Sequence, residues 1–168
     1  GNQRCLSFEL RVTPKARQFA YRDHLGNTVH HFNVPGRYSK LMLVAESLVE
    51  IDPVPEPEPL AADAWAELDA MVAHEDHWDM LMPSEYARPS QQLLELKREL
   101  KIERESDPLT TVRELKAKLY GHFEYVPNST AVDSPIEVAL TNRKGVCQDF
   151  AHITIALLRE LRMPSRYV

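Results

Sequence analysis

The stretch that decides the fold is Gly145-Val146-Cys147-Gln148-Asp149-Phe150-Ala151-His152. The segment that follows is apolar on nearly every side, with Phe150, Ala151, Ile153, Ile155, Ala156, Leu157, Leu158 and Leu161. This pattern predicts a buried helix, with Cys147 in its first turn. The first N–H groups of a helix are unpaired and its N-terminus is the positive end of the dipole, so this position favours a thiolate. Cys147 is therefore a candidate nucleophile for covalent catalysis.

The sequence on either side of this helix indicates how the chain enters and leaves it. Ser134-Pro135-Ile136-Glu137 has the pattern of a capping box and predicts a short helix that ends near Asn142. A tight connection then leads to Gly145 and should hold Cys147 rigidly. Met163-Pro164 should stop the long helix. We expect residues 166–168 to begin a strand.

The ordered string around the cysteine resembles the bacterial transglutaminase-like superfamily. The similarity covers Arg143 to His152, continues through Ile155-Ala156-Leu157-Leu158-Arg159, and resumes at Met163-Pro164-Ser165-Arg166-Tyr167-Val168. Members of this family are described as cysteine proteases. The resemblance implies a thiol-dependent amide hydrolase or acyl-transferase in which Cys147 is the nucleophile. It also implies that a histidine and an aspartate beyond Val168 complete a papain-like triad.

Four residues near Cys147 are supporting candidates for the site: Gly145, Gln148, Asp149 and His152. Asp149 stabilises the first turn of a helix with or without a function. His152 lies five positions after Cys147, so it points to another face of the helix, and we expect a structural histidine that hydrogen-bonds a neighbouring segment. Neither is assigned to a triad.

Two other readings of Cys147 stay open at this point. A lone cysteine in an apolar helix is commonly a small buried hydrophobe, so the helix could be purely structural. Alternatively, the chain is a non-catalytic binding or scaffold domain derived from this fold. The 168 residues lack the downstream histidine and aspartate, so we expect the chain by itself to be inactive.

The remaining helical periodicity begins at residue 61. Trp65, Leu68, Met71 and Val72 recur at helical spacing. Ser90 should cap a following leucine-rich helix, and Ser106-Asp107-Pro108 should start the next one. The buried stripe of this last helix is expected to consist of Leu109, Val112, Leu115 and Leu119.

The first fifty residues read as strands. Leu6, Phe8, Leu10 and Val12 alternate with polar residues and predict a half-buried strand ended by Pro14. Further strands are expected at residues 17–24 and 28–34, joined by a turn at Gly26-Asn27, and at residues 41–51 after a turn at Pro35-Gly36. The last strand is apolar on both faces and should pack on two sides.

This N-terminal region also resembles the small β-domain that precedes the core in the bacterial family, through Leu10-Arg11-Val12-Thr13-Pro14, residues 22–27 and residues 31–36. The predicted fold is α+β: a partial antiparallel β-domain (1–51), a proline-rich linker (52–60) and the helical first half of a papain-like, transglutaminase-like core (61–168).

Composition narrows the classes of partner. The formal net charge of -5 argues against binding to nucleic acids or anionic membranes. No apolar run could span a bilayer and no signal peptide is visible, so we expect a cytoplasmic protein. Two cysteines do not make a disulfide framework, and Cys5 reads as a structural thiol in a strand.

The substrate implied by the resemblance is a protein or peptide amide, and no cofactor is expected. Neither the His30-His31 pair nor the segment His74-Glu75-Asp76-His77-Trp78-Asp79 has metal-ligand spacing, so no metal site is predicted. The long helix carries apolar residues on more faces than this chain can cover. We therefore expect self-association through that surface.

Overall fold

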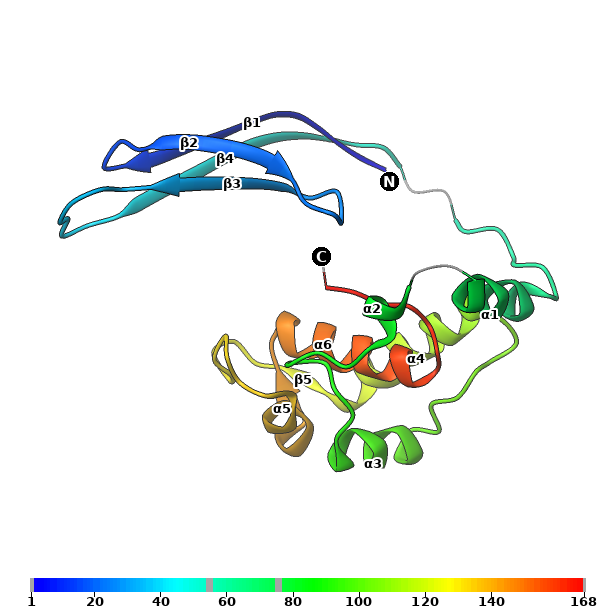
Figure 1. Cartoon of the computed structure of the whole chain (residues 1–168). Helices are drawn as coiled ribbons and strands as arrows, with labels where there is room; N and C mark the ends of the chain where they lie inside the picture. Colours follow the sequence, from blue (N-terminus) through cyan, green and yellow to red (C-terminus); the bar gives the residue numbers. More distant parts are fainter. Residues whose placement is uncertain (1, 54–55, 75–76, 168) are drawn as a thin grey trace. The chain divides into compact units, whose positions relative to one another are not determined.

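The chain divides into two compact units, residues 1–57 and 58–168, which we call the N-terminal unit and the helical unit. The structure, a computed structural model, describes residues 2–53, 56–74 and 77–167. The boundary between the units falls inside the proline-rich segment that was predicted to be a linker. Small antiparallel sheets followed by helices confirm the predicted α+β class (Figure 1).

The N-terminal unit consists of four strands that pair in two antiparallel ribbons. Strand β1 (Gln3–Thr13) pairs with β4 (Met42–Ile51), and β2 (Arg17–Arg22) pairs with β3 (Thr28–Asn33) (Figure 1). The register of β1 and β4 runs from Gln3 opposite Ile51 to Thr13 opposite Met42, with an irregularity between Cys5 and Ser7. The long-range partner of β1 is therefore the last strand of the unit.

The turn between β2 and β3 forms where Gly26-Asn27 predicted it. Asp23 organises this turn, since its Oδ1 accepts the N–H groups of Leu25 at 2.9 Å and Asn27 at 2.8 Å. The hydrogen bond from the Asn27 side-chain amide and these backbone bonds hold the pKa of Asp23 below its ordinary value. Gly26 has φ +82°, a conformation that glycine adopts without strain.

Burial in the N-terminal unit differs from the sequence prediction. In β1 we expected a half-buried apolar face, but Leu6 and Phe8 are exposed and Val12 alone is buried among the described residues of the strand. In β4 we expected packing on both faces, yet Leu43 and Leu48 are also exposed. Alternation predicted the strands correctly, but it cannot supply the second layer that would cover them.

The helical unit contains all the helices of the described chain. In order they are α1 (Ala64–His74), α2 (Trp78–Leu81), α3 (Gln91–Glu99), α4 (Pro108–His122), α5 (Ile136–Asn142) and α6 (Cys147–Glu160). Two short strands, β5 (Glu124–Tyr125) and β6 (Lys144–Gly145), form a parallel bridge just before α6. None of the described helices is long and apolar enough to cross a membrane.

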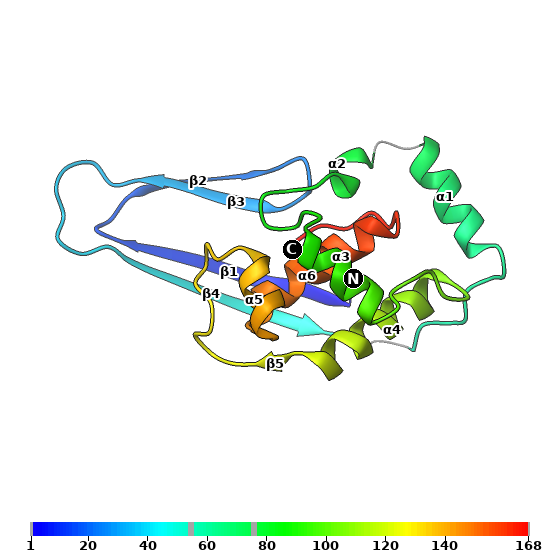
Figure 2. The ribbon, with the colours of Figure 1, turned by 90° about the horizontal axis from the view of Figure 1, so that it is seen from below.

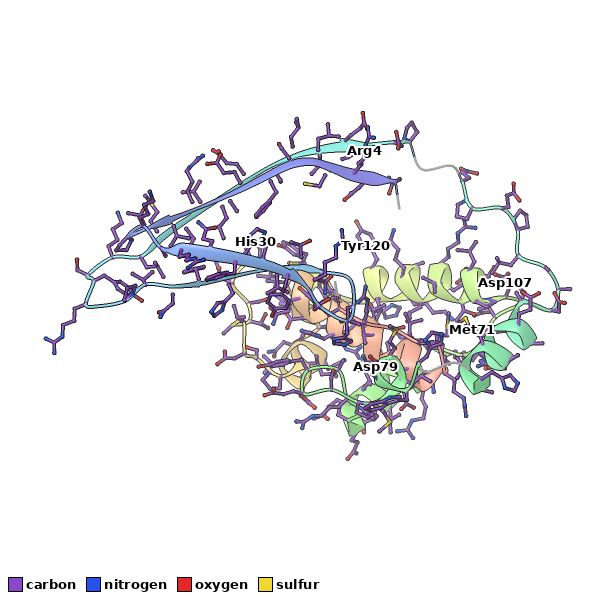
Figure 3. The ribbon with its side chains drawn as sticks, turned by 45° about the horizontal axis from the view of Figure 1, so that its top comes forward. Arg4, His30, Met71, Asp79, Asp107 and Tyr120 are labelled. Carbon is purple, nitrogen blue, oxygen red and sulfur yellow. The ribbon has the colours of Figure 1, made fainter. Side chains whose placement is uncertain are left out.

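Two of the three predicted helix caps are confirmed in detail. Ser90 Oγ accepts the Leu93 N–H at 3.2 Å at the start of α3, and Asp107 Oδ1 accepts the Thr110 N–H at 2.9 Å at the start of α4. Figure 3 labels Asp107 at this end of α4. The capping box at Ser134 is wrong. Its Oγ accepts the Ala131 N–H of the preceding loop at 2.8 Å, so it is not free to cap α5.

Helix α6 lies at the centre of the helical unit and contacts α3, α4 and α5 (Figure 2). Its buried apolar residues join a single core with α3, α4 and α5, and the fully enclosed side chains include Leu93, Leu96, Leu115, Ile136, Ile153 and Leu157. The predicted stripe of α4 needs two corrections, the first being that Leu109 is only half-buried. The second is that Thr111 is buried in place of Val112, because its hydroxyl accepts the Glu105 N–H and donates to Asp107 O, both at 2.9 Å.

Helix α1 is fastened to the core by polar contacts. Trp65 Nε1 donates to Glu105 O at 2.9 Å, and the guanidinium of Arg104 lies over the Trp65 ring at 4.2 Å. Arg104 also makes two hydrogen bonds of 2.7 Å to Asp69 and donates to Leu161 O. The pKa of Asp69 is lowered by this guanidinium. These contacts tie α1 to the end of α6.

Candidate active site

Cys147 is the first residue of α6, as predicted. The N-cap is Val146, whose N–H donates to Asp149 Oδ2 at 2.8 Å. The same carboxylate oxygen accepts the Thr130 hydroxyl at 2.5 Å, and Asp149 is buried with 1% exposure. Asp149 therefore fixes the helix start from within the first turn and also anchors the loop before α5. The sequence predicted the local stabilisation, but it gave no signal for the Thr130 partner.

Gly145 has a steric reason to be glycine. A Cβ atom at this position would lie 3.0 Å from both Asp149 Cβ and Asp149 Oδ2, closer than most real Cβ contacts. The residue is also the last one of β6, where it is bridged to Tyr125. The missing side chain allows the buried carboxylate to pack directly against the backbone that leads to Cys147.

The thiol of Cys147 is exposed and not disulfide-bonded. It opens onto a groove of about 640 Å³ that runs along α6 and is walled by the segment after the helix. The lining residues are Cys147, Phe150, Ala151, Thr154, Ile155, Leu158, Ser165, Arg166 and Tyr167. The interpretation of Cys147 as a buried hydrophobe is therefore wrong. The core contacts of α6 are made by its other faces, and the thiol lies on the face that is open to solvent.

Gln148 connects the first turn of α6 to the loop that precedes α5. Its Nε2 donates to Val132 O at 2.6 Å. With the Thr130–Asp149 bond, this contact attaches residues 130–132 beside the start of the helix. Gln148 points to the loop and is not one of the residues that line the groove.

The His152 side chain packs against aromatic rings of two other segments. Its ring contacts those of Tyr86 and Tyr167, with centroid separations of 5.5 Å and 5.1 Å. We expected a hydrogen bond to a neighbouring segment, and aromatic contacts with two segments replace it. Burial lowers the pKa of His152, and the charge of Asp149 opposes this shift. His122 is also engaged elsewhere, because its Nδ1 lies 2.8 Å from Lys118 O.

The wall of the groove is formed by residues 165–167, which sequence reasoning assigned to a strand. These residues have no strand pairing, and Val168 lies outside the described residues. Arg159 holds the wall through two hydrogen bonds to Ser165 O, of 3.1 Å from Nε and 2.8 Å from Nη2. It also donates to Met82 O at 2.6 Å. Nothing in the local pattern around Arg159 indicates this clamp.

The described residues contain no cluster of three or more histidine, cysteine, aspartate or glutamate side chains that could hold a metal ion. Glu75 and Asp76 of the ligand-rich segment lie outside the described residues. The chemistry offered by this arrangement is that of an accessible thiol at a helix N-terminus, next to an apolar groove. The contacts of His122 and His152 are with Lys118 O and with two tyrosine rings, and neither histidine is held against the sulfur as a base.

Comparisons with known proteins agree with this geometry. Residues 96–168 match the model of the transglutaminase-like superfamily, and residues 1–50 match that of the bacterial transglutaminase-like N-terminal region. The chain is 29% identical over 155 residues to an uncharacterized protein of Mycobacterium leprae (92% of this chain, 54% of the relative). It is 30% identical over 181 residues to one of Mycobacterium tuberculosis (99% and 54%).

A solved structure shares the fold of this chain. It is described as a "putative cysteine protease" from Cytophaga hutchinsonii, with a TM-score of 0.68 and 22% sequence identity, over 97% of this chain and 55% of the other. The chain thus spans about half the length of the relatives it matches. Each family model matches one of the two units. The N-terminal model covers the strands of the N-terminal unit, and the core model covers the part of the helical unit that contains Cys147. The chain therefore carries a bacterial transglutaminase-like N-terminal region at residues 1–50 and part of a transglutaminase-like core at residues 96–168.

Proposed function

We propose that Cys147 is the nucleophile of a thiol-dependent amide hydrolase or acyl-transferase formed by the whole protein. The observation that carries this proposal is the exposed thiol at the first residue of α6, open to a groove large enough for a peptide segment. The match of residues 96–168, which include Cys147, to the transglutaminase-like superfamily supports it. A structural cysteine would need neither the exposure nor the groove.

The reaction follows from the position of the thiol. The Cys147 thiolate attacks the carbonyl carbon of an amide, and the carbonyl oxygen becomes an oxyanion. The Cys147 backbone N–H is unpaired at the start of the helix and is the candidate donor to that oxygen. Collapse of the tetrahedral intermediate breaks the C–N bond and releases the protonated amine, which leaves a thioester on Cys147. Water or a second amine then takes the acyl group.

Proton transfer in this scheme needs a base, and the two histidines considered for this role contact other groups in the described part of the chain. His152 is packed against two tyrosine rings and His122 contacts Lys118 O. We propose that a histidine from the rest of the protein, oriented by an aspartate, performs this role. Without it, general acid–base catalysis worth about 10²–10⁴-fold is lost, so we expect only trace turnover from this chain alone.

The test compares Cys147→Ala with Cys5→Ala in the whole protein, using peptide amides and esters as substrates. Both cysteines are exposed, so Cys5 is a matched control for the loss of a free thiol. We expect Cys147→Ala to abolish turnover and the Cys5 variant to retain it. Mass spectrometry of the quenched enzyme should find an acyl group on Cys147 that hydroxylamine removes.

Two results would contradict the proposal. Turnover that survives Cys147→Ala would remove Cys147 from the chemistry. A whole protein that is folded, whose Cys147 reacts with iodoacetamide, and that turns over none of these substrates would instead support the non-catalytic binding or scaffold role. An added primary amine separates hydrolysis from acyl transfer, because only an acyl-transferase would form the new amide at the expense of the free acid.

A further inference from the structure

The groove beside Cys147 contains one unused charge. Its other described lining residues are apolar or neutral, and Arg166 is the one charged side chain among them. Arg166 is half-buried, and in the part of the chain that the structure describes it has no ion pair or hydrogen-bonded partner. Two other arginines of this unit are held by partners, Arg104 by Asp69 and Arg159 by Ser165 O. An unpaired guanidinium in a groove is available to bind an anion, and carboxylates match its planar pair of donors.

The backbone on both sides of Arg166 is held in place. Ser165 O accepts two hydrogen bonds from Arg159, and Ser165 N–H donates to Met80 O at 2.9 Å. Tyr167 stacks on His152, which projects from α6 itself. The wall that carries Arg166 is therefore tied to the same helix that begins with Cys147. Less conformational freedom has to be lost when a ligand binds to such an anchored wall.

The apolar part of the groove defines the rest of the ligand. Phe150, Ile155 and Leu158 line it from α6, so the groove that holds the thiol and the guanidinium also offers apolar surface for a hydrocarbon stem. We propose that Arg166 binds a carboxylate of the acyl donor, so that the groove selects amide substrates with a carboxylate and a short apolar spacer near the scissile bond. This inference rests on the proposed role of Cys147 and names the class of substrate for that site.

The test uses alkylation of Cys147, which needs no catalytic base. The probes are N-iodoacetyl-glycine and its neutral counterpart N-iodoacetyl-glycinamide, with longer pairs made from β-alanine and γ-aminobutyrate. In each reaction the cysteine sulfur displaces iodide, and the two members of a pair differ only in the tail charge. Rates at Cys147 and Cys5 are read from the same sample by peptide mass spectrometry. The ratio of the anionic to the neutral rate at Cys5 gives the reference for an exposed thiol outside the groove.

We expect the ratio at Cys147 to exceed that at Cys5 by about two- to fivefold, the range of a partly exposed charge pair, and to peak at one tail length. Arg166→Gln should bring the ratio down to the Cys5 value, and Arg166→Lys should restore part of it. The control is Arg162→Gln, which removes the same charge from an exposed residue that lines a different pocket. Circular dichroism checks that each variant keeps its helices.

The inference is overturned if Arg166→Gln lowers the ratio no more than Arg162→Gln does. It is also overturned if the whole protein cleaves carboxylate-bearing and neutral substrates equally well, in which case the proposed function of Cys147 stands without it. Conversely, an Arg166-dependent ratio in a whole protein that lacks turnover supports the anion site and removes the proposed catalysis.

Discussion

The two units of this chain bury their apolar residues very differently. In the N-terminal unit the strands pair correctly, but large apolar side chains such as Phe8, Phe19 and Leu48 remain exposed. In the helical unit α6 and its neighbours enclose a continuous core. Strand pairing satisfies backbone hydrogen bonds without covering side chains, whereas helices satisfy their backbone internally and gain stability only by packing. We therefore expect most of the stability of the chain to lie in the helical unit.

The largest expected effect is a pair of leucine truncations, one in each unit. Leu157 in α6 is 0% exposed and Leu48 in β4 is 59% exposed. Leu157→Ala should lower the free energy of unfolding by about 2–5 kcal/mol, because it leaves a cavity in a packed core. Leu48→Ala should change it by less than about 0.5 kcal/mol. Urea unfolding followed by far-UV circular dichroism, in both the helical and the strand bands, measures both, and equal losses would mean that the faces of β4 are covered after all.

A second comparison concerns two aspartates that organise the backbone. Asp149 is buried and accepts from Val146 N–H and Thr130 Oγ1, whereas Asp23 holds a surface turn. Asp149→Ala should cost about 1–3 kcal/mol of unfolding free energy, because it leaves the partners in the structure unsatisfied. Asp23→Ala should cost less, since water can replace its carboxylate.

The same two aspartate variants can also be compared by the alkylation rate of Cys147. Loss of Asp149 should also slow iodoacetamide alkylation of Cys147, because the start of α6 is no longer fixed. The Asp23 variant is the control for that rate. Unchanged stability and unchanged alkylation in Asp149→Ala would show that the buried carboxylate does not set the helix start.

A third comparison asks which unit causes self-association. Tyr120 and Tyr125 of the helical unit are exposed beside an apolar pocket of about 340 Å³ (Figure 3 labels Tyr120). Exposed apolar surface of a few hundred Å² corresponds to several kcal/mol at about 25 cal/mol per Å². The sequence placed self-association on uncovered faces of the long helix, but none of the described large apolar side chains of α6 is exposed. We therefore expect the chain to dimerise through this neighbouring pocket, which Phe150 and Thr154 of α6 also line. Tyr125→Glu should weaken the dimer by about tenfold or more, because a charge would be buried in the interface.

Sedimentation across a concentration series measures this association. Tyr38→Glu provides the matched control, because Tyr38 is an exposed tyrosine of the N-terminal unit. A dimer weakened by Tyr38→Glu and not by Tyr125→Glu would assign the interface to the strands instead. A chain that stays monomeric at every concentration would remove the prediction for both units.

The smallest expected effect is a pH dependence specific to the helical unit. Burial lowers the pKa of His152 below its ordinary value of about 6.5. The unfolded chain keeps the ordinary pKa. At a pH between the folded and the unfolded pKa, His152 is protonated in the unfolded chain and neutral in the folded chain. The stabilisation is therefore complete above pH 6.5 or so and is lost as the pH falls toward the folded pKa. His152→Phe should flatten that part of the stability curve, and His24→Phe, at an exposed site, should leave it unchanged.

Sequence reasoning succeeded where the determinant lies within a few residues. The turn at Gly26, the caps at Ser90 and Asp107, and the start of α6 at Cys147 all depend on contacts at sequence separations of four or less. It failed where a nearby residue had another partner. Ser134 was a plausible cap, but Ala131 takes its hydroxyl, and Thr111 replaces Val112 in the core because two backbone groups satisfy its side chain.

By itself the sequence determined the element types, the family resemblance and the identity of the candidate nucleophile. Each of these follows from local pattern or from an ordered string of residues. Only the tertiary structure decided what surrounds Cys147: the Thr130 partner of Asp149, the two tyrosines around His152, and the Arg159 clamp that places Arg166 on the groove. These partners are brought together by the packing of the core, which joins residues distant in the chain and leaves no periodic trace in it.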